Sequence, residues 1–355
     1  MQRLLAFLKK EIVFTVALVA ALLSFLVTPP GAHVLAGIDV TTLLMLFSLM
    51  TVVAGLRRIG VFDRLGAALT IACFFLAMVA TNDVALLTLV PFTLVLMQGA
   101  AGSSVILTVV LETIAANLGS MVTPIGNPQN LYLYSSGQLA LADFPGLTWP
   151  YALSSLVLLL ALCLLVPAQK VSAQSAEKAA LPRKGLILYS LLGLAALLSI
   201  AKVIPAWLLA AIVLVAALAF DRKVLRQVDF VLLGTFVCFF VFVASVKECT
   251  PVKAWLEGLM ASSPMLVSLL CSQVISNVPA CLLLSPFTTD SAALMLGVNL
   301  GGLGTLVASL ASLISFKLYA AAKEAKKGSF MLVFTALNIA FLAVLLMQAW
   351  LLGSL

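Results

Sequence analysis

Long apolar segments constrain this chain more than any other feature. A helix needs about 20 consecutive apolar residues to cross the hydrocarbon core of a bilayer. Seven segments approach or reach that length: 12–28, 40–56, 149–167, 185–201, 206–220, 229–246 and 329–352. Of the 355 residues, 63% are apolar and only 9% are charged, whereas a soluble protein carries about 25% charged residues. We therefore expect an all-α polytopic membrane protein and exclude a soluble enzyme and a DNA-binding protein.

Four further apolar regions are interrupted in their middles by polar or helix-breaking residues. They are residues 64–97, 103–137, 254–289 and 291–318. An unpaired backbone amide costs several kcal/mol in hydrocarbon, so such a break is tolerated only inside protein or beside a water-filled cavity. We expect residues 64–97 and 254–289 to form re-entrant helical hairpins, and the other two regions to form broken transmembrane helices.

The positions of the basic residues predict the orientation of the chain. If both hairpins return to the side they entered, 17 of the 20 Lys and Arg lie on the side of the N-terminus, and Lys202, Lys247 and Lys253 lie on the other. Basic residues concentrate in cytoplasmic loops. We expect nine crossings of a bacterial-type inner (plasma) membrane, with a cytoplasmic N-terminus and an extracytoplasmic C-terminus. The basic stretch 3–10 followed by an apolar run resembles a signal peptide, but we assign residues 12–28 to the first transmembrane helix because this segment has a counterpart in the second half.

The two halves of the chain match in order and at nearly constant spacing. The matching segments are 38–40 with 228–230 (a shift of 190), 81–83 and 90–92 with 276–278 and 285–287 (a shift of 195), and 117–123 with 299–305 (a shift of 182). We predict repeats at 1–167 and 205–355, joined by a linker and one connecting helix at 168–204. Four crossings per repeat and one helix between them turn the second repeat upside down. Inverted repeats with discontinuous helices are typical of secondary transporters.

A polar segment marks the tip of each predicted hairpin. The first is Thr81-Asn82-Asp83 and the second is Ser276-Asn277-Val278. Such residues often do no more than cap a helix start. These two, however, fall about one helix length into the bilayer at equivalent points of the repeats. Two helix N-termini aimed at one point favour an anion, and the oxygens beside them can hold a dehydrated Na⁺.

The broken helices carry proline and glycine where a membrane helix would continue. The first contains Thr123-Pro124-Ile125-Gly126-Asn127-Pro128-Gln129-Asn130, and the second contains Gly301-Gly302-Leu303-Gly304-Thr305. Proline interrupts the helix and releases carbonyl groups, which can coordinate a cation. The glycines of the second break are also explained by close helix packing.

Asp83 and Glu112 are the only acids within the predicted hydrocarbon region, which contains no Lys or Arg. An ionisable residue at that depth is a hypothesis for a functional site. Asp83 either couples transport to a cation or proton or caps its helix, and Glu112 serves either coupling or an internal hydrogen bond. The single histidine, His33, falls in a predicted outer loop, and the six cysteines show no CxxC spacing. We expect no metal centre, no disulfide framework and no cofactor apart from a bound Na⁺.

The order of these motifs resembles the ion-transporter superfamily of divalent-anion/sodium symporters, citrate permeases, arsenite permeases and some sodium/proton antiporters. The stretch 123–130 looks like that of uncharacterised bacterial anion-permease-like members. The resemblance covers about residues 12–350. It implies a homodimer in which hairpins and broken helices move as a transport domain against a scaffold, an elevator-type alternating access. In the dicarboxylate symporters each hairpin tip reads Ser-Asn-Thr, whereas Asp83 and Val278 replace the two threonines here.

The resemblance also implies two cation sites with a solute between the tips. The predicted solute contacts are Asn82, Asp83, Thr123, Asn127, Ser276, Asn277 and Thr305. The predicted contacts of Na⁺ or H⁺ are Thr81, Asn82, Asp83, Gly126, Ser276, Asn277, Gly302, Gly304 and Thr305.

The leading functional hypothesis is a secondary active transporter of a small anion, a di- or tricarboxylate or an inorganic oxyanion, coupled to Na⁺ or H⁺. The alternative on the same fold is a Na⁺/H⁺ antiporter in which Asp83 is the exchanging carboxylate. An enzyme is disfavoured because the sequence offers no metal-ligand cluster and no nucleophile–base pair. We expect a small anion, Na⁺ or H⁺, lipid and a second copy of the chain as partners, and no nucleic acid.

Overall fold

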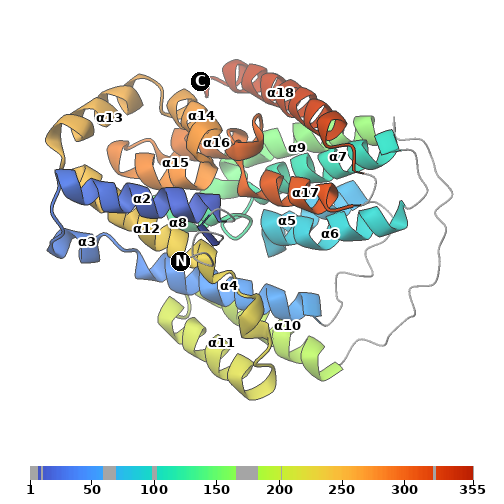
Figure 1. Cartoon of the computed structure of the whole chain (residues 1–355), viewed down its shortest axis with the longest axis horizontal. Coiled ribbons are helices and arrows are strands. Elements are labelled where there is room, and N and C mark those ends of the chain that lie inside the picture. Colours follow the sequence, from blue (N-terminus) through green and yellow to red (C-terminus); the bar gives the residue numbers. More distant parts are fainter. Residues whose placement is uncertain are drawn as a thin grey trace. The chain divides into compact units, whose positions relative to one another are not determined.

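The computed structural model describes residues 7–8, 11–58, 69–97, 102–164, 183–200, 202–322 and 325–354. Every regular element within these ranges is a helix (Figure 1), which confirms the all-α class. The helices form two compact units. Unit 1 comprises residues 1–55, 187–262 and 282–289, and unit 2 comprises residues 56–186, 263–281 and 290–355. We describe each unit separately.

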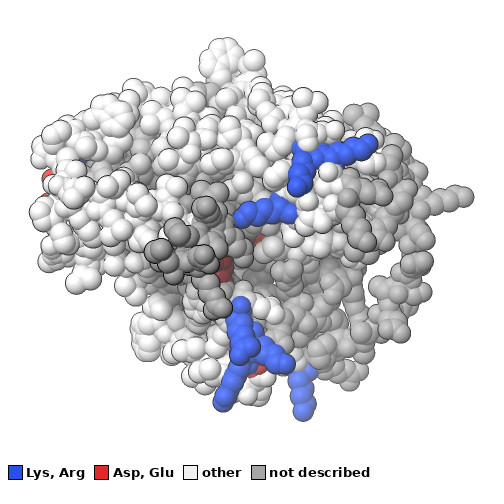
Figure 2. All heavy atoms as spheres, in the orientation of Figure 1, with Lys and Arg blue, Asp and Glu red and all other residues white. Residues whose placement is uncertain are grey.

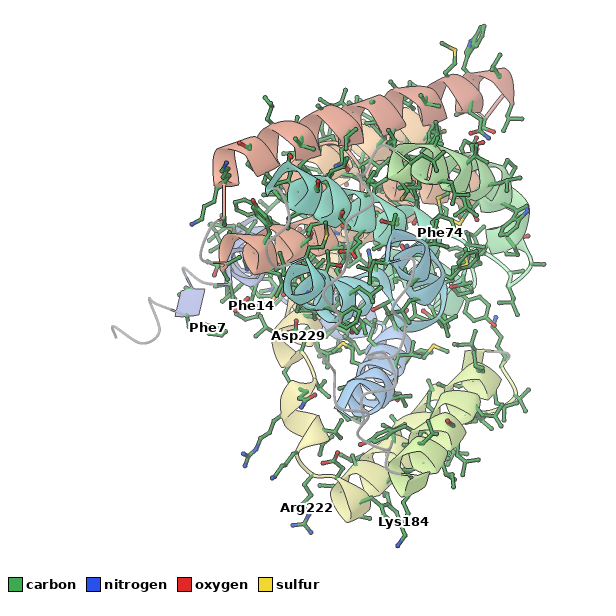
Figure 3. All side chains as sticks on the ribbon, turned by 90° about the vertical axis from the view of Figure 1, so that its right-hand side faces the viewer. Phe7, Phe14, Phe74, Lys184, Arg222 and Asp229 are labelled. Atoms are coloured by element: carbon green, nitrogen blue, oxygen red, sulfur yellow. The ribbon has the colours of Figure 1, made fainter. Side chains whose placement is uncertain are left out.

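Unit 1 gathers the helices that have no polar break, together with α13 and η3 from the interrupted region 254–289. They are α2 (Ile12–Val27), α3 (Ala32–Ala36), α4 (Val40–Arg58), α10 (Arg183–Ile200), α11 (Ala206–Phe220), η2 (Val224–Gln227), α12 (Phe230–Glu248), α13 (Thr250–Ser262) and η3 (Ser285–Phe287). Helix α2 packs along α12. Asp229 caps α12, because its Oδ1 accepts a hydrogen bond from the Leu232 amide at 2.8 Å. Figure 3 shows Arg222 pointing away from the ribbon just beyond α11.

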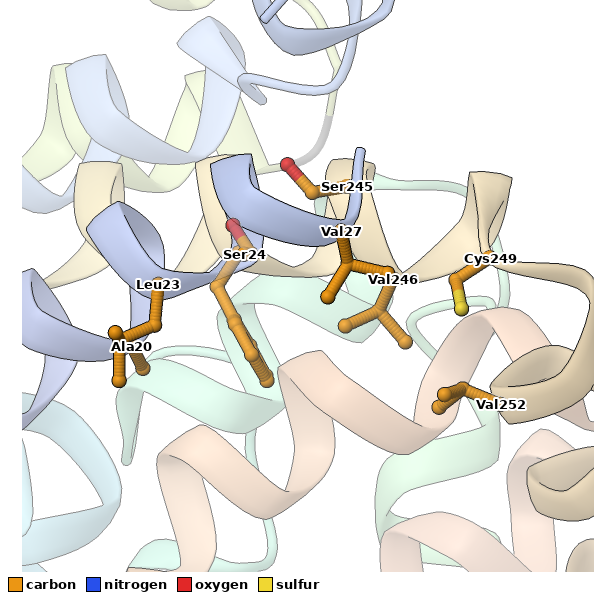
Figure 4. Close-up of a pocket in the computed structure, with 9 residues that line it drawn as sticks. Ala20, Leu23, Ser24, Val27, Ser245, Val246, Cys249 and Val252 are labelled. Carbon is orange, nitrogen blue, oxygen red and sulfur yellow. The ribbon is translucent and has the colours of Figure 1, made fainter. Parts of the chain in front are cut away.

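A groove of about 400 Å³ lies on unit 1 between α2 and α12 (Figure 4). Its lining residues are Ala20, Leu23, Ser24, Val27, Phe242, Ser245, Val246, Cys249 and Val252. The hydroxyls of Ser24 and Ser245 donate to backbone carbonyls of their own helices. The groove therefore presents apolar surface and does not have the chemistry of an anion site.

Unit 2 contains the interrupted segments. Its helices are α5 (Leu69–Ala80), α6 (Asn82–Leu96), α7 (Gly102–Ser120), α8 (Pro128–Ser135), α9 (Asp143–Cys163), α14 (Pro264–Ile275), α15 (Asn277–Leu284, whose first five residues belong to this unit), α16 (Ser291–Leu300), η4 (Leu306–Ala308), α17 (Leu310–Ala320) and α18 (Lys327–Leu351). Helix α7 is its centre and packs against α5, α6, α9, α17 and α18.

Small residues allow the central helices of unit 2 to approach closely. A Cβ added to Gly119 on α7 would lie 2.1 Å from the carbonyl oxygen of Phe74 on α5 (Figure 3 labels Phe74). A Cβ added to Gly297 on α16 would lie 2.0 Å from Oγ of Ser268 on α14. Because lipid offers helices no hydrophobic reason to associate, such close packing and interhelical hydrogen bonds hold a membrane bundle together.

The exposed surface agrees with a lipid environment. Four described helices, α7, α9, α12 and α18, are long and apolar enough to cross a membrane, and a fifth is added if α13 and α14 count as one bent span. On α18, Leu332, Ile339 and Trp350 are exposed while Phe334 and Leu345 are buried. Figure 2 shows Lys and Arg at only a few places on the visible face. The number of nine crossings and the orientation stay predictions.

The structure divides the predicted hairpin region 254–289 more finely than the sequence indicates. Helix α13 ends at Ser262, and α14 begins at Pro264. Ser263 caps α14 by accepting a hydrogen bond from the Leu266 amide at 3.4 Å, and proline suits the first position of a helix because it has no amide to satisfy. The hairpin arms are therefore α14 and α15. The first hairpin is described from residue 69 onward as α5 and α6, and residues 64–68 lie outside the described residues.

Candidate solute and ion site

Both hairpin tips carry the same backbone distortion. Thr81 separates α5 from α6 with a φ of 70°, and Ser276 separates α14 from α15 with a φ of 76°. A positive φ is uncommon outside glycine, and for a β-branched threonine it is an outlier. Such a residue costs about 1–3 kcal/mol and persists where the surroundings impose it, often at functional sites. The two tips thus share one geometry at positions that the 195-residue shift makes equivalent.

Asn82 attaches the first tip to the first broken helix. Its backbone amide donates to the carbonyl oxygen of Gly126 at 2.9 Å, and its side-chain Nδ2 donates to Oδ1 of Asn117 at 3.3 Å. Its Oδ1 accepts the Asp83 amide at 2.9 Å. The side chain is only 4% exposed. Asn82 is therefore held by three elements of unit 2, and Asp83 follows it in the first turn of α6.

Asn277 lies at the second tip against the second broken helix. Its Oδ1 accepts the Val278 amide at 2.9 Å, which repeats the contact between Asn82 and Asp83. A Cβ added to Gly302 would lie 2.9 Å from Nδ2 of Asn277, so only glycine leaves room for the amide. Within the described residues, Nδ2 of Asn277 donates no hydrogen bond. The amide group therefore retains a donor for a solute.

Each tip meets one member of a pair of groups, Asn117 and Gly302, that lie next to each other. Asn117 accepts the Asn82 amide, and its own Nδ2 points to the carbonyl oxygen of Gly302 at 3.5 Å. A Cβ added to Gly302 would in turn meet Nδ2 of Asn277, so the Asn277 amide lies beside Gly302. Asn82 and Asn277 are 195 positions apart in the chain but are linked in space through Asn117 and Gly302.

The broken helices are fastened to each other by reciprocal hydrogen bonds. Asn127, the N-cap of α8, donates from Nδ2 to Oδ1 of Asn299 at 2.8 Å. Ser309, at the start of α17, donates from Oγ to Oδ1 of Asn117 at 2.9 Å. At the repeat shift of 182, Asn299 is the equivalent of Asn117 and Ser309 is the equivalent of Asn127. Each bond therefore joins one repeat to the other, and the two bonds are equivalent.

A second pair of bonds completes this connection. Nδ2 of Asn299 donates to Oδ1 of Asn130 at 2.8 Å, and Nδ2 of Asn117 donates to Oγ of Ser312 at 3.3 Å. Asn130 and Ser312 are again 182 positions apart. We call Asn117, Asn127, Asn130, Asn299, Ser309 and Ser312 the polar clamp. All six are at least 96% buried, so the clamp is part of the interior of unit 2.

A third equivalent pair holds each break against its hairpin. Oγ1 of Thr123 donates to the carbonyl oxygen of Met78 at 2.5 Å, and Oγ1 of Thr305 donates to the carbonyl oxygen of Gln273 at 3.1 Å. Gln273 occupies the position of Met78 in the second repeat and adds a side-chain amide. Its Nε2 donates to the carbonyl oxygens of Gly301 and Leu303, both at 2.8 Å, and its Oε1 accepts the Thr305 amide at 2.9 Å.

Carbonyl groups of the breaks, including those of Gly126 and Gly302 that are expected to hold a cation, already accept hydrogen bonds from protein. Gly126 accepts the Asn82 amide, and Gly302 faces Nδ2 of Asn117. The carbonyl oxygen of Thr123 accepts Nδ2 of Asn130 at 3.1 Å. A carbonyl oxygen has two lone pairs. The Thr123 oxygen uses both, since it also accepts the Gly126 amide at 3.3 Å, whereas the oxygens of Gly126 and Gly302 each retain one that could face an ion.

The predicted site residues fall into three groups: those of the hairpin tips, those of the breaks, and Asn127 and Thr305, which differ in exposure. Thr81, Asn82, Asp83, Ser276 and Asn277 form the tips, and Thr123, Gly126, Gly302 and Gly304 form the breaks beside them. Gly304 has a φ of 103°, a conformation that favours glycine. Asn127 is 1% exposed with both amide atoms bonded inside the protein, whereas Thr305 is exposed. Asn127 therefore serves the clamp rather than an open contact surface.

Sequence reasoning did not assign site roles to Asn117, Asn299, Asn130, Gln273 and Ser309. Asn117 and Asn299 were visible as matching positions of the repeat. Their roles could have been suspected because an asparagine inside an apolar membrane segment needs a partner. Gln273, three residues before the Ser276 tip, carries the same signal. No group of three or more His, Cys, Asp or Glu that could bind a metal is found in the described part of the chain.

Comparison with known proteins places these features in a group of transport proteins. Residues 4–296 match the family described as citrate transporter. The inner membrane protein YbiR of Escherichia coli is 31% identical over 301 residues, which cover 80% of this chain and 81% of that protein. The uncharacterized transporter MJ0456 of Methanocaldococcus jannaschii is 29% identical over 322 residues, which cover 87% of this chain and 88% of that protein.

Proposed function

Because the chain belongs to the citrate transporter family, we propose that it is a secondary active transporter of a small anion, coupled to Na⁺ or H⁺. The anion is a di- or tricarboxylate or an inorganic oxyanion. The family and the names of both relatives indicate a membrane-embedded transporter rather than an enzyme. The family description alone does not select one anion for this chain.

One observation carries the proposal: the two hairpin tips reach a common point in unit 2. Helices α6 and α15 both begin at an asparagine, and both asparagines lead to the Asn117–Gly302 contact. Helix N-termini carry partial positive charge, so they suit an anion. The Asn277 amide adds a donor that no described residue accepts.

Charge balance supports a co-transported cation. The tip segments 81–83 and 276–278 contain a carboxylate, Asp83, and no basic residue. An anionic solute placed beside an ionised Asp83 would be repelled, since two like charges at short range destabilise one another. A Na⁺ or H⁺ at Asp83 removes that repulsion, so solute and cation would bind together.

The division into two units supports movement of one unit against the other. Both hairpin tips and both broken helices fall within unit 2, tied together by the polar clamp, whereas the uninterrupted helices α2, α11 and α12 fall within unit 1. In the elevator mechanism that we propose, unit 2 carries the solute as a rigid body and unit 1 is the scaffold of a homodimer.

The experiment is uptake into proteoliposomes. Purified protein is reconstituted and tested with labelled citrate, succinate, phosphate and sulfate under an imposed Na⁺ gradient, an imposed pH gradient, or neither. Accumulation of one anion above its equilibrium level under either gradient supports the proposal. A pH gradient that dissipates on addition of Na⁺ with no anion present supports the Na⁺/H⁺ antiporter instead. That alternative is favoured by Asp83, the only carboxylate at a tip.

A further inference from the structure

Glu112 is a fully buried acid that the proposed solute site does not use. It lies within α7 with 0% of its surface exposed. The hydroxyl of Thr93, on α6, donates a hydrogen bond to Oε1 of Glu112. Its other oxygen, Oε2, is buried and has no hydrogen-bond partner among the described residues. One of the two oxygens of the carboxyl group therefore lacks a hydrogen bond within the described part of unit 2.

No described neighbour supplies a positive charge to this carboxyl group. The titratable groups that interact with it are thiols, Cys73 of α5 and Cys163 of α9. The other charged residues on the helices packed against α7 are Asp83 of α6, Asp143 of α9, Lys317 of α17, Lys327 of α18 and Asp290 at the start of α16. The three on α16, α17 and α18 are exposed; Asp143 begins α9, and Asp83 lies ten residues before Thr93.

The second repeat has no carboxyl group at the equivalent place. The 182-residue shift that relates the clamp residues converts Glu112 into Leu294, which is fully buried on α16. One repeat thus fills the position with a leucine and the other with an acid. An acid that only filled space would be replaced by leucine at little cost, since ionised acids are expensive to bury.

We propose that Glu112 is a proton-binding residue of this transporter, separate from the hairpin tips, and that it exchanges its proton during transport. This inference rests on the proposed transport function. An unpaired carboxylate in a dry interior costs several kcal/mol, so the buried group is neutral and carries a proton. When Glu112 releases its proton, one O–H bond breaks and the proton passes to water that is open to one compartment. The carboxylate that remains takes a proton from the other compartment.

The position of Glu112 links its charge to the solute site. It lies five residues before Asn117, about 7.5 Å along α7 at 1.5 Å per residue. Its partner Thr93 lies on α6, the helix that begins at Asn82. Helices α6 and α7 thus join Glu112 to both partners of the Asn82–Asn117 bond. A charge on Glu112 would alter the contact of these two helices and so the position of the tip.

The test compares the wild type with Glu112→Gln, which keeps the shape of the neutral acid and an oxygen for Thr93. In proteoliposomes, Glu112→Gln should retain solute binding and solute–solute exchange at wild-type rates. Its accumulation of anion under a pH gradient should fall at least tenfold, and a pH dye should register no proton movement. Unchanged proton-driven accumulation in Glu112→Gln overturns the proposal. So does transport by the wild type that responds to Na⁺ alone and moves no proton.

Infrared difference spectroscopy tests protonation even if no transported anion is found. The purified wild type should show the C=O stretching band of a protonated carboxylic acid that titrates with pH, and Glu112→Gln should lack that band. An identical band in both proteins, or its absence from the wild type, contradicts the proposal. If the wild type shows the band but transports no anion, Glu112 is protonated as proposed, and the proposed transport function is the part that is wrong.

Discussion

Asn127 donates a hydrogen bond to Asn299, 172 residues later in the chain, with 2.8 Å between Nδ2 and Oδ1. The bond joins the first broken helix to the second, and Ser309 returns an equivalent bond to Asn117. The same pairs recur at a shift of 182, so the repeat visible in the sequence is also a repeat of hydrogen bonds. Each half supplies the partners that satisfy the buried amides of the other.

The polar clamp should behave as a coupled network. We expect the double-mutant cycle of Asn127→Ala and Asn299→Ala to give a coupling free energy of about 0.6–1.7 kcal/mol, the range found for hydrogen bonds between membrane helices. Reversible unfolding in mixed micelles measures it. The matched control pairs Asn127→Ala with Asn338→Ala, a buried asparagine of α18 that bonds to its own helix at Phe334. That cycle should give a coupling energy near zero, and equal coupling in both cycles would contradict a specific clamp.

The two tip asparagines should differ in their effect on stability. Asn82→Ala loses the bond to Asn117 as well as the cap on the Asp83 amide, whereas Asn277→Ala loses only the cap on Val278. We expect Asn82→Ala to be less stable than Asn277→Ala by about 1 kcal/mol, the typical net value of one hydrogen bond. Thermal unfolding without added solute measures the difference. Equal melting temperatures would argue against the Asn82–Asn117 bond.

Asp83 should control the response to the coupling cation. Asp83→Asn removes the charge but keeps a side-chain oxygen, so the variant should fold and the tip should keep its geometry. We expect the half-saturating concentration of Na⁺, or of H⁺, for uptake to change at least tenfold. Asp290→Asn is the control, since Asp290 caps α16 at an exposed position outside both tip segments. If Asp83→Asn and Asp290→Asn both keep the wild-type cation dependence, Asp83 is a helix cap only.

Gly302 should be needed to leave space for the Asn277 amide. Gly302→Ala would bring a Cβ to 2.9 Å from Nδ2 of Asn277, which displaces a tip donor that bonds to no described residue. We expect uptake to fall at least tenfold while the purified protein remains folded. Gly146→Ala on α9 is the matched control, because a Cβ there meets nothing within 4 Å. Wild-type uptake by Gly302→Ala would show that the Asn277 amide does not contact the solute.

Part of this architecture could be predicted from the sequence, for definite reasons. Polar residues that interrupt an apolar segment are costly in hydrocarbon, so the breaks at Thr81, Ser276 and Gly126 were visible without coordinates. The family was predicted from the same motifs and is confirmed. The boundary at Ser263 was not predicted, because a serine and a proline in an apolar region also fit within a continuous hairpin arm.

The remaining site residues could not be predicted because their partners come from other elements. Gln273 lies inside a helix, and its role depends on the carbonyls of Gly301 and Leu303, which face it only after folding. Asn127 reads as a solute contact when it follows a Pro-Ile-Gly break. In the structure it caps α8 and bonds to Asn299. Sequence patterns locate a polar residue in the membrane, but they do not show whether protein or solute satisfies it.

Equilibrium binding of a labelled anion tests the central claim most directly. The anion accumulated in the uptake assay is titrated against purified wild type, Asn82→Ala, Asn277→Ala and the control Asn338→Ala, with and without Na⁺ and at two pH values. We predict saturable binding by the wild type and Asn338→Ala, and a loss of at least tenfold in affinity in both tip variants. Wild-type affinity in both Asn82→Ala and Asn277→Ala would place the solute elsewhere and contradict the account.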